Sequence, residues 1–157
     1  MTLGQPGSYT FTDGRIMVEE EGVMGAIARQ AHAWAVWAFV AAIVVQVFLA
    51  GAAIADLGGS GDFATHREFG YTAVGIVALV VLITAIAARA GRRNIGISFG
   101  LLVLYIVQTS LPAFKASLPQ VAALHPLNAM FLFIVAIWYA RVAWRNRTLA
   151  SPTQAGM

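Results

Sequence analysis

The sequence predicts an all-α membrane protein, a transmembrane four-helix bundle whose N and C termini are both cytoplasmic. The first observation is composition: 59% of the 157 residues are hydrophobic and only 11% are charged, whereas a soluble domain carries about 25% charged residues. The second is a mean hydropathy of +0.75. The third is that four apolar stretches follow one another with short polar connections between them.

The four predicted helices run from about Ala31 to Ile54, His66 to Ala88, Ile95 to Leu111 and Val121 to Trp144. Each is long enough to cross a bilayer, which takes roughly 20 apolar residues, and the third is the shortest. Pro112 ends the third, because a residue before proline disfavours the helical conformation. Short connections make neighbouring helices antiparallel, so residues 31–147 are predicted to form one bundle.

Basic residues give the predicted orientation. Eight of them fall on one side of the predicted helices, and only Arg67 and Lys115 fall on the other. Because cytoplasmic loops are enriched in Lys and Arg, the majority side is predicted to be cytoplasmic. Its residues are Arg15, Arg29, Arg89, Arg92, Arg93, Arg141, Arg145 and Arg147.

The two ends of the chain are polar. Residues 1–30 are expected to be a cytoplasmic N-terminal extension, either a solvated tail with a short interfacial helix or a segment that docks onto a partner subunit. They lack the basic start and early apolar core of a secretory signal. Residues 148–157 are expected to be a disordered tail.

Composition also excludes several kinds of chemistry. The absence of cysteine excludes a disulfide framework, a thiolate-held iron–sulfur cluster and a cysteine nucleophile. Because the basic residues cluster at the ends of apolar runs, they indicate membrane topology and not a nucleic-acid partner. A zinc site would need about four ligands, and no recognised spacing supplies them.

Two of the three histidines are predicted to lie at the same membrane depth on the outer side. His66 opens the second helix, His125 lies about one turn inside the fourth, and both helices run inward. His32 lies at the cytoplasmic start of the first helix, too far away to join them. Ionisable residues within membrane helices are rare and usually functional. We therefore expect His66 and His125 to be the two axial ligands of one haem b, although His66 alone is equally compatible with a headgroup position.

Small residues accompany both histidines. Gly70 and Ala129 each follow a histidine by four residues and therefore share its helix face. They are expected to let a porphyrin approach, and the alternative is ordinary close packing of membrane helices. Pro126 is expected to kink or loosen the fourth helix beside His125.

Three polar residues complete the predicted cofactor site. Arg67 and Lys115 are the only cations on the outer side, and they are expected to pair with haem propionates unless they simply extend to the interface. Gln108 is polar within an apolar helix. It is expected either to hydrogen-bond a ligand or to bridge helices.

These residues resemble a known family. The run His66-Arg67-Glu68-Phe69-Gly70, then Gln108, then Ala123-Leu124-His125 resembles one four-helix half of the haem A synthase family. That resemblance implies a histidine at the outer end of the second and fourth helices, around a haem. In the catalytic half of the synthase a glutamate precedes the first histidine by three residues, and here that position is Phe63.

The chain is also similar to a poorly characterised group of small bacterial four-helix membrane proteins. The similarity covers roughly residues 35–145. The residues that carry it are Val45-Gln46-Val47-Phe48-Leu49-Ala50-Gly51, His66-Arg67 and Leu124-His125-Pro126-Leu127-Asn128. It implies a multi-pass protein of the bacterial inner membrane.

The expected function is that of a membrane b-type cytochrome-like protein, with one bis-histidine haem per chain near the outer face for electron transfer. Its partner would be a quinone, an oxidase or an external redox protein. The first alternative is a non-catalytic accessory subunit of a larger membrane complex. The second is a haem-modifying enzyme resembling haem A synthase, although an enzymatic role is the less favoured expectation.

Overall fold

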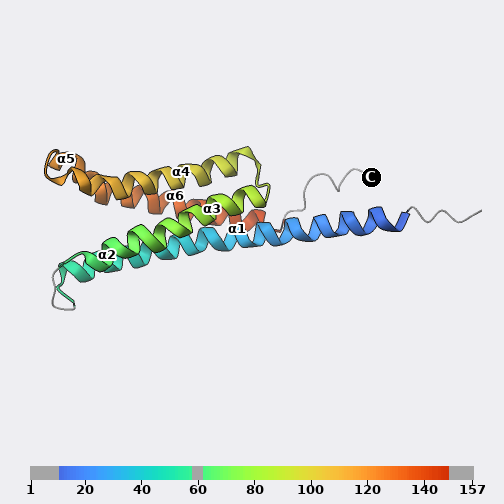
Figure 1. Cartoon of the computed structure of the whole chain (residues 1–157), viewed down its shortest axis with the longest axis horizontal. Coiled ribbons are helices and arrows are strands. Elements are labelled where there is room, and N and C mark those ends of the chain that lie inside the picture. The colour runs from blue at the N-terminus through green and yellow to red at the C-terminus, as the bar shows by residue number, and fades with distance from the viewer. Residues whose placement is uncertain (1–10, 58–61, 149–157) are drawn as a thin grey trace, which may run out of the picture.

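The computed structural model describes residues 11–57 and 62–148, and these form an all-α bundle (Figure 1). Its long helices are α1 (Phe11–Ile54), α3 (Gly75–Ala87), α4 (Gly91–Ser110) and α6 (Leu124–Asn146). Shorter helical segments join them: α2 (Ala64–Phe69), the π-helical turn η1 (Gly70–Val74), the 3-10 turn η2 (Leu111–Lys115) and α5 (Pro119–Ala122).

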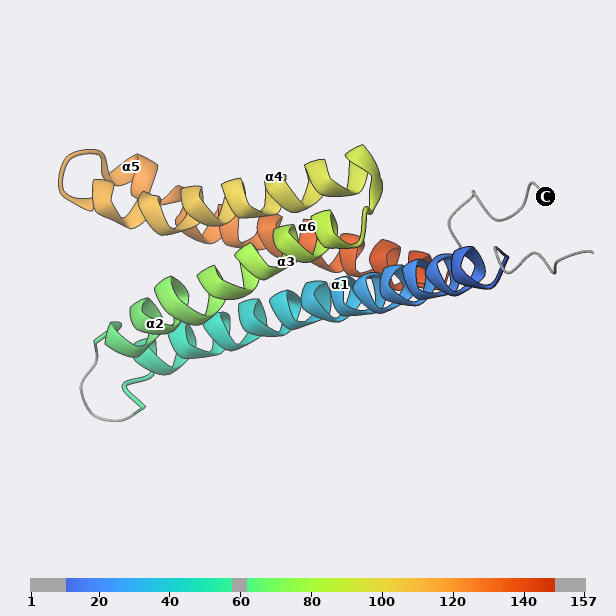
Figure 2. The ribbon, with the colours of Figure 1, turned by 45° about the vertical axis from the view of Figure 1, so that its right-hand side comes forward.

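The helices pack as a ring of antiparallel neighbours. α1 contacts both α3 and α6, and α4 contacts the same two helices from the other side (Figure 2). Four helical stretches in the described residues are long and apolar enough to cross a membrane, and they span Val23–Ile54, Ala64–Ala87, Gly91–Lys115 and Pro119–Asn146. The predicted all-α bundle of four apolar helices is thus confirmed.

The first helix is much longer than predicted. The sequence placed its start near Ala31, but α1 runs without interruption from Phe11, and its first part projects beyond the other helices (Figure 1). The segment between these points contains no proline and several good helix formers, among them three consecutive glutamates, so nothing stops the helix. The first ten residues of the predicted extension, and all of the predicted tail after Thr148, lie outside the described residues.

The second membrane-spanning stretch contains a wide turn. Between α2 and α3 the backbone makes the π-helical turn η1, which leaves carbonyl groups without their usual partner four residues on. The Tyr105 hydroxyl of α4 lies 3.1 Å from the carbonyl oxygen of Gly70 and 3.4 Å from that of Tyr71. Tyr105 therefore stabilises the wide turn from a neighbouring helix.

Prolines mark both ends of the connection between α4 and α6. α4 ends at Ser110, and Pro112 lies in the 3-10 turn η2 that follows, as predicted. Before α6 the helix is interrupted at Ala123, and α5 ends at Ala122. A proline ring clashes with the carbonyl four residues earlier, and for Pro126 that residue is Ala122. The loosening predicted beside His125 is therefore confirmed as a break at this point.

The core lies in the middle of the bundle and toward the end where α3 meets α4. Its buried residues are small or β-branched in many places, so the helices approach closely. They include Ala33, Val36, Phe39, Val40, Ala78, Val81, Leu101, Leu132, Ala136, Tyr139 and Ala140. Toward the opposite end the helices separate around a cavity.

Candidate functional site

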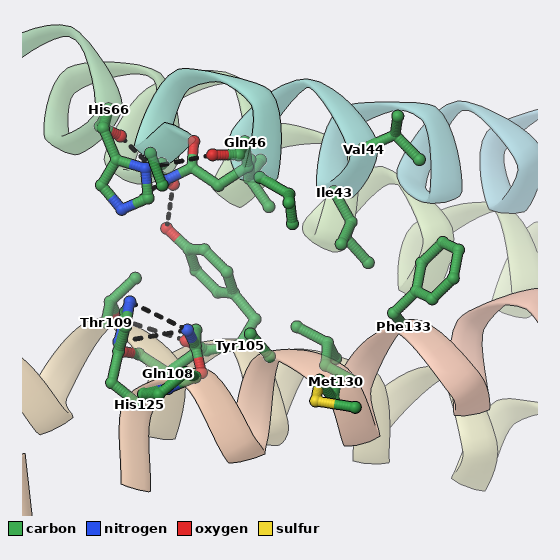
Figure 3. A pocket seen from close by; sticks show the side chains of 17 residues that line it. Ile43, Val44, Gln46, His66, Tyr105, Gln108, Thr109, His125, Met130 and Phe133 are labelled. Atoms are coloured by element: carbon green, nitrogen blue, oxygen red, sulfur yellow. Dashed lines mark hydrogen bonds between the residues drawn. The ribbon is translucent and has the colours of Figure 1, made fainter. Parts of the chain in front are cut away.

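The cavity has a volume of about 510 Å³ and lies between α1, the α2–η1 segment, α4 and α6 (Figure 3). Five of the seven residues predicted from the sequence to bind a cofactor line its wall: His66, Gly70, Gln108, His125 and Ala129. The rest of the wall is mainly aliphatic and aromatic. A volume of this size is within the range of small-molecule and cofactor sites.

The two histidines are brought together as the sequence predicted. His66 comes from α2 and His125 from the first turn of α6. Their ring centroids are 6.3 Å apart, and their planes form an angle of 73°. Both side chains are half-buried. Figure 3 shows His66 on one side of the cavity and His125 on the other.

One nitrogen of each imidazole is tied to the backbone of the preceding long helix. The Nδ1 of His66 lies 3.1 Å from the carbonyl oxygen of Gln46, and the Nδ1 of His125 lies 2.9 Å from the carbonyl oxygen of Gln108. A carbonyl oxygen only accepts, so Nδ1 carries the proton and donates in both rings. Nε2 is then left with a lone pair, the form in which histidine binds metals.

The side chains of the same two glutamines also touch the rings. The carboxamide nitrogen of Gln46 is 3.2 Å from the Nε2 of His66 and 2.8 Å from the His66 carbonyl oxygen. The carboxamide nitrogen of Gln108 is 3.1 Å from both ring nitrogens of His125. Asn128 donates to the Gln108 side-chain oxygen over 2.8 Å and to the Leu104 carbonyl over 3.1 Å. Gln108 thus bridges α4 and α6 beside a histidine.

The remaining predicted residues have different surroundings. A Cβ at Gly70 would lie 2.7 Å from the carboxamide nitrogen of Gln46, so Gln46 uses the space that glycine leaves there. Ala129 lines the cavity on the α6 side. Arg67 and Lys115 are exposed and lie outside the cavity wall, and their pairing with propionates stays a prediction.

Sequence reasoning missed Gln46, Tyr105 and Asn128 as parts of the site. A signal for Gln46 is present: the pattern Val-Gln-x-x-Leu occurs at residues 45–49 and again at residues 107–111. Each occurrence lies in the long helix that precedes a predicted haem ligand, 20 residues before His66 and 17 before His125. Tyr105 gives no such signal, because its role depends on the π-helical turn.

The third histidine belongs to a separate cluster. His32 is 5% exposed. Its Nδ1 lies 3.1 Å from the Thr84 hydroxyl, and its Nε2 lies 2.9 Å from the Tyr139 hydroxyl. The Tyr139 hydroxyl is also 3.0 Å from the Ser98 hydroxyl and 3.0 Å from the carbonyl oxygen of Asn94. The cluster joins α1, α3, α4 and α6, and none of its side chains lines the cavity.

Comparisons with known proteins found a similarity for part of the chain. The search of curated proteins found no match, and neither did the search of solved structures. The resemblance to haem A synthase therefore stays a prediction. Residues 46–114, from Gln46 through His66 and Gln108 to the turn η2, match the model of a family of unknown function (DUF6220), so over this part, under half of its length, the chain is similar to that family.

Proposed function

We propose that this protein is a membrane b-type cytochrome-like protein that binds one haem b per chain, with His66 and His125 as axial ligands, and that it transfers electrons. The observation that carries the proposal is the relation of the two imidazoles. They face one cavity from different helices, and the Nδ1 of each is engaged by a backbone carbonyl. Haem-ligating histidines commonly donate their second nitrogen in this way.

The separation of the rings supports an iron between them. A metal–imidazole bond is about 2 Å long and the ring centre lies about 1 Å further, so two imidazoles on opposite sides of one metal have centres about 6 Å apart. The observed centroid distance is 6.3 Å. Within the described residues, no group of three or more His, Cys, Asp or Glu side chains could hold a metal ion. A pair of imidazoles suits a macrocycle that supplies the other four ligands itself.

The walls of the cavity suit the faces of a porphyrin. They are mainly apolar, and Ala129 is a small residue on the cavity wall near His125, while the space beside Gly70 would become free only when the Gln46 carboxamide moves. If His66 and His125 both held the iron of a porphyrin, they would leave it no free position for oxygen or substrate. Transfer of single electrons fits such a site better than oxygen chemistry.

The finer resemblance to haem A synthase supports a haem pocket more than a haem-modifying reaction. Phe63 occupies the position of the catalytic glutamate, and its ring packs edge-on against His66 with centroids 5.8 Å apart. An aromatic side chain stands where that family uses an acid. We therefore keep oxidation of a haem methyl group as the less favoured proposal.

We further propose that the cavity opens at the extracytoplasmic face of a bacterial inner membrane. The support is the distribution of Lys and Arg in the sequence, which favours a cytoplasmic location for both termini. A single haem near one face does not carry electrons across a bilayer. The proposed partner is therefore a quinone or a redox protein on that side, or a neighbouring subunit.

The experiment is a reduced-minus-oxidised optical spectrum of protein purified from haem-replete cells. The proposal predicts the sharp α band of a six-coordinate bis-imidazole haem. A featureless spectrum would contradict it and favour the accessory-subunit alternative. Mass spectrometry of added haem tests the enzymatic alternative, which requires a modified porphyrin as product.

A further inference from the structure

The two halves of the histidine site are built alike but satisfied differently. In each half a glutamine carbonyl fixes the tautomer of a histidine, and the carboxamide of the same glutamine lies against the ring. The halves differ in what happens to the Nε2 lone pair and to the oxygen of the carboxamide. These differences bear on how a ligand enters the site.

In the first half the Nε2 of His66 is covered. The Gln46 carboxamide nitrogen lies 3.2 Å from this atom and donates to it, while its second hydrogen reaches the His66 carbonyl at 2.8 Å. Turning the amide over would place its oxygen against two acceptors, so the assigned orientation is the favourable one. The nitrogen that must bind iron is therefore capped by a hydrogen bond.

The other end of the same carboxamide is unsatisfied. The Oε1 of Gln46 is buried and has no hydrogen-bond partner among the residues that the structure describes. A buried acceptor without a donor costs free energy. The capping position of Gln46 is therefore held by only one end of its carboxamide, and no hydrogen bond from the described residues holds the oxygen end in place.

In the second half the carboxamide is held at its oxygen but does not cap the histidine. Asn128 donates to the Gln108 Oε1 over 2.8 Å. The Gln108 nitrogen is 3.1 Å from both Nδ1 and Nε2 of His125. The lone-pair directions of the two ring nitrogens diverge, so a donor equidistant from both is aligned with neither. The Nε2 lone pair of His125 therefore stays available.

We propose that Gln46 is a displaceable cap on His66, so that the Nε2 of His125 would be the first nitrogen available to a metalloporphyrin and the Nε2 of His66 would become available only after the Gln46 side chain has moved away. Gln46 is thus a positioning residue that holds the site when it is empty and controls when the second imidazole becomes available to a metal. The identity of the ligand as an iron porphyrin rests on the proposed function, but the cap itself is a property of the ligand-free protein.

The test uses diethyl pyrocarbonate, a small apolar reagent that carbethoxylates imidazole nitrogens bearing a free lone pair. Rates for each histidine are measured on the full-length protein in detergent by mass spectrometry of its peptides. In the unsubstituted protein we expect His125 to react about fivefold faster than His66, the factor associated with one ordinary hydrogen bond. His32, bonded at both nitrogens, serves as the slow internal reference.

Two matched substitutions of glutamine by leucine, which has a similar shape, show which glutamine slows the reaction of His66. Gln46→Leu should raise the His66 rate about fivefold, to that of His125, whereas Gln108→Leu should leave the His66 rate unchanged. Circular dichroism and gel filtration confirm that both variants fold. A His66 rate equal to or above that of His125 in the unsubstituted protein, or one that Gln46→Leu leaves unchanged, would overturn the cap.

Haem titration then separates the cap from the proposed function. If haem binds, Gln46→Leu should speed the conversion from five-coordinate to six-coordinate spectrum, and Gln108→Leu should not. If the pyrocarbonate rates follow the prediction but no variant binds haem, the cap stands and the haem proposal fails. If haem binds while the pyrocarbonate rates do not follow the prediction, the haem proposal stands and the cap fails.

Discussion

The bundle holds histidines near both of its ends, and their surroundings at the two ends are opposite in kind. At the His32 end four helices close tightly, and both nitrogens of the ring meet hydroxyl groups. At the His66–His125 end the helices part around a cavity of about 510 Å³, and a buried carboxamide oxygen of Gln46 has no partner in the described part of the chain. The same residue type therefore has different surroundings at the two ends.

The difference gives a criterion for telling a histidine that holds the helices together from one that we propose to bind a ligand. Burial does not, because His32 is the most buried of the three. A polar cluster with every member paired specifies one packing of the helices. A cluster beside open space, with an acceptor unpaired, has capacity for a ligand. His66 and His125 meet the second description, and His32 meets the first.

Substitution of the histidines should give the largest effect. His66→Ala and His125→Ala should each reduce haem content from one per chain to near zero at micromolar protein, because one axial bond is lost and a porphyrin would be left with a single ligand. His32→Ala should keep haem at the unsubstituted level in whatever fraction folds. Haem is quantified by its absorbance after extraction. Equal losses of haem in all three variants would show that the two ends of the bundle do not differ in haem binding.

The free energy of unfolding should show the reverse order, with a larger loss for a substitution in the His32 cluster than for one at the cavity. Tyr139→Phe removes a hydroxyl that lies within hydrogen-bonding distance of His32, Ser98 and Asn94, and it should lower the free energy of unfolding by about 1–3 kcal/mol. Gln46→Leu removes an unpaired buried oxygen but also the donor to the His66 Nε2 and carbonyl, so the two effects offset and the change should be within about 1 kcal/mol. Equilibrium unfolding in mixed detergent micelles measures both. A larger loss for Gln46→Leu would mean that the cavity end stabilises the fold.

Two glycines test the wide turn that borders the cavity, with a smaller effect. A Cβ at Gly75 would lie 2.5 Å from the Tyr105 hydroxyl, while a Cβ at Gly51 would meet nothing within 4 Å. Gly75→Ala should displace Tyr105 from the Gly70 carbonyl and cost about 1 kcal/mol. Gly51→Ala should be neutral or slightly stabilising, because alanine favours a helix over glycine by about 1 kcal/mol. Thermal unfolding compares the two variants, and identical midpoints would show that Tyr105 does not stabilise η1.

The sequence was sufficient for the bundle and for the meeting of its two histidines. Apolar length located all four membrane-spanning stretches, and the shared depth of His66 and His125 followed from counting residues along antiparallel helices. Pro112 and Pro126 marked the ends of regular helix because their effect is local. In each case the prediction rests on the order of residues along a helix and not on contacts between helices.

Features that depend on contacts between helices were not predictable in the same way. The start of α1 was placed near Ala31 because apolarity begins there, but a helix continues through polar residues when nothing breaks it. Gln46 acts through His66 on another helix, and Tyr105 acts through a π-helical turn. Arg67 and Lys115 were selected for charge alone, and the structure places both on the exposed surface.

The central claim is that His66 and His125 hold one haem between them. The most direct measurement is the ratio of haem to polypeptide in protein purified from haem-replete cells, with the spectrum of the same sample. We predict a ratio of one and a low-spin spectrum of bis-imidazole type. A ratio near zero would contradict the claim outright, and a ratio of two would contradict a single haem site per chain.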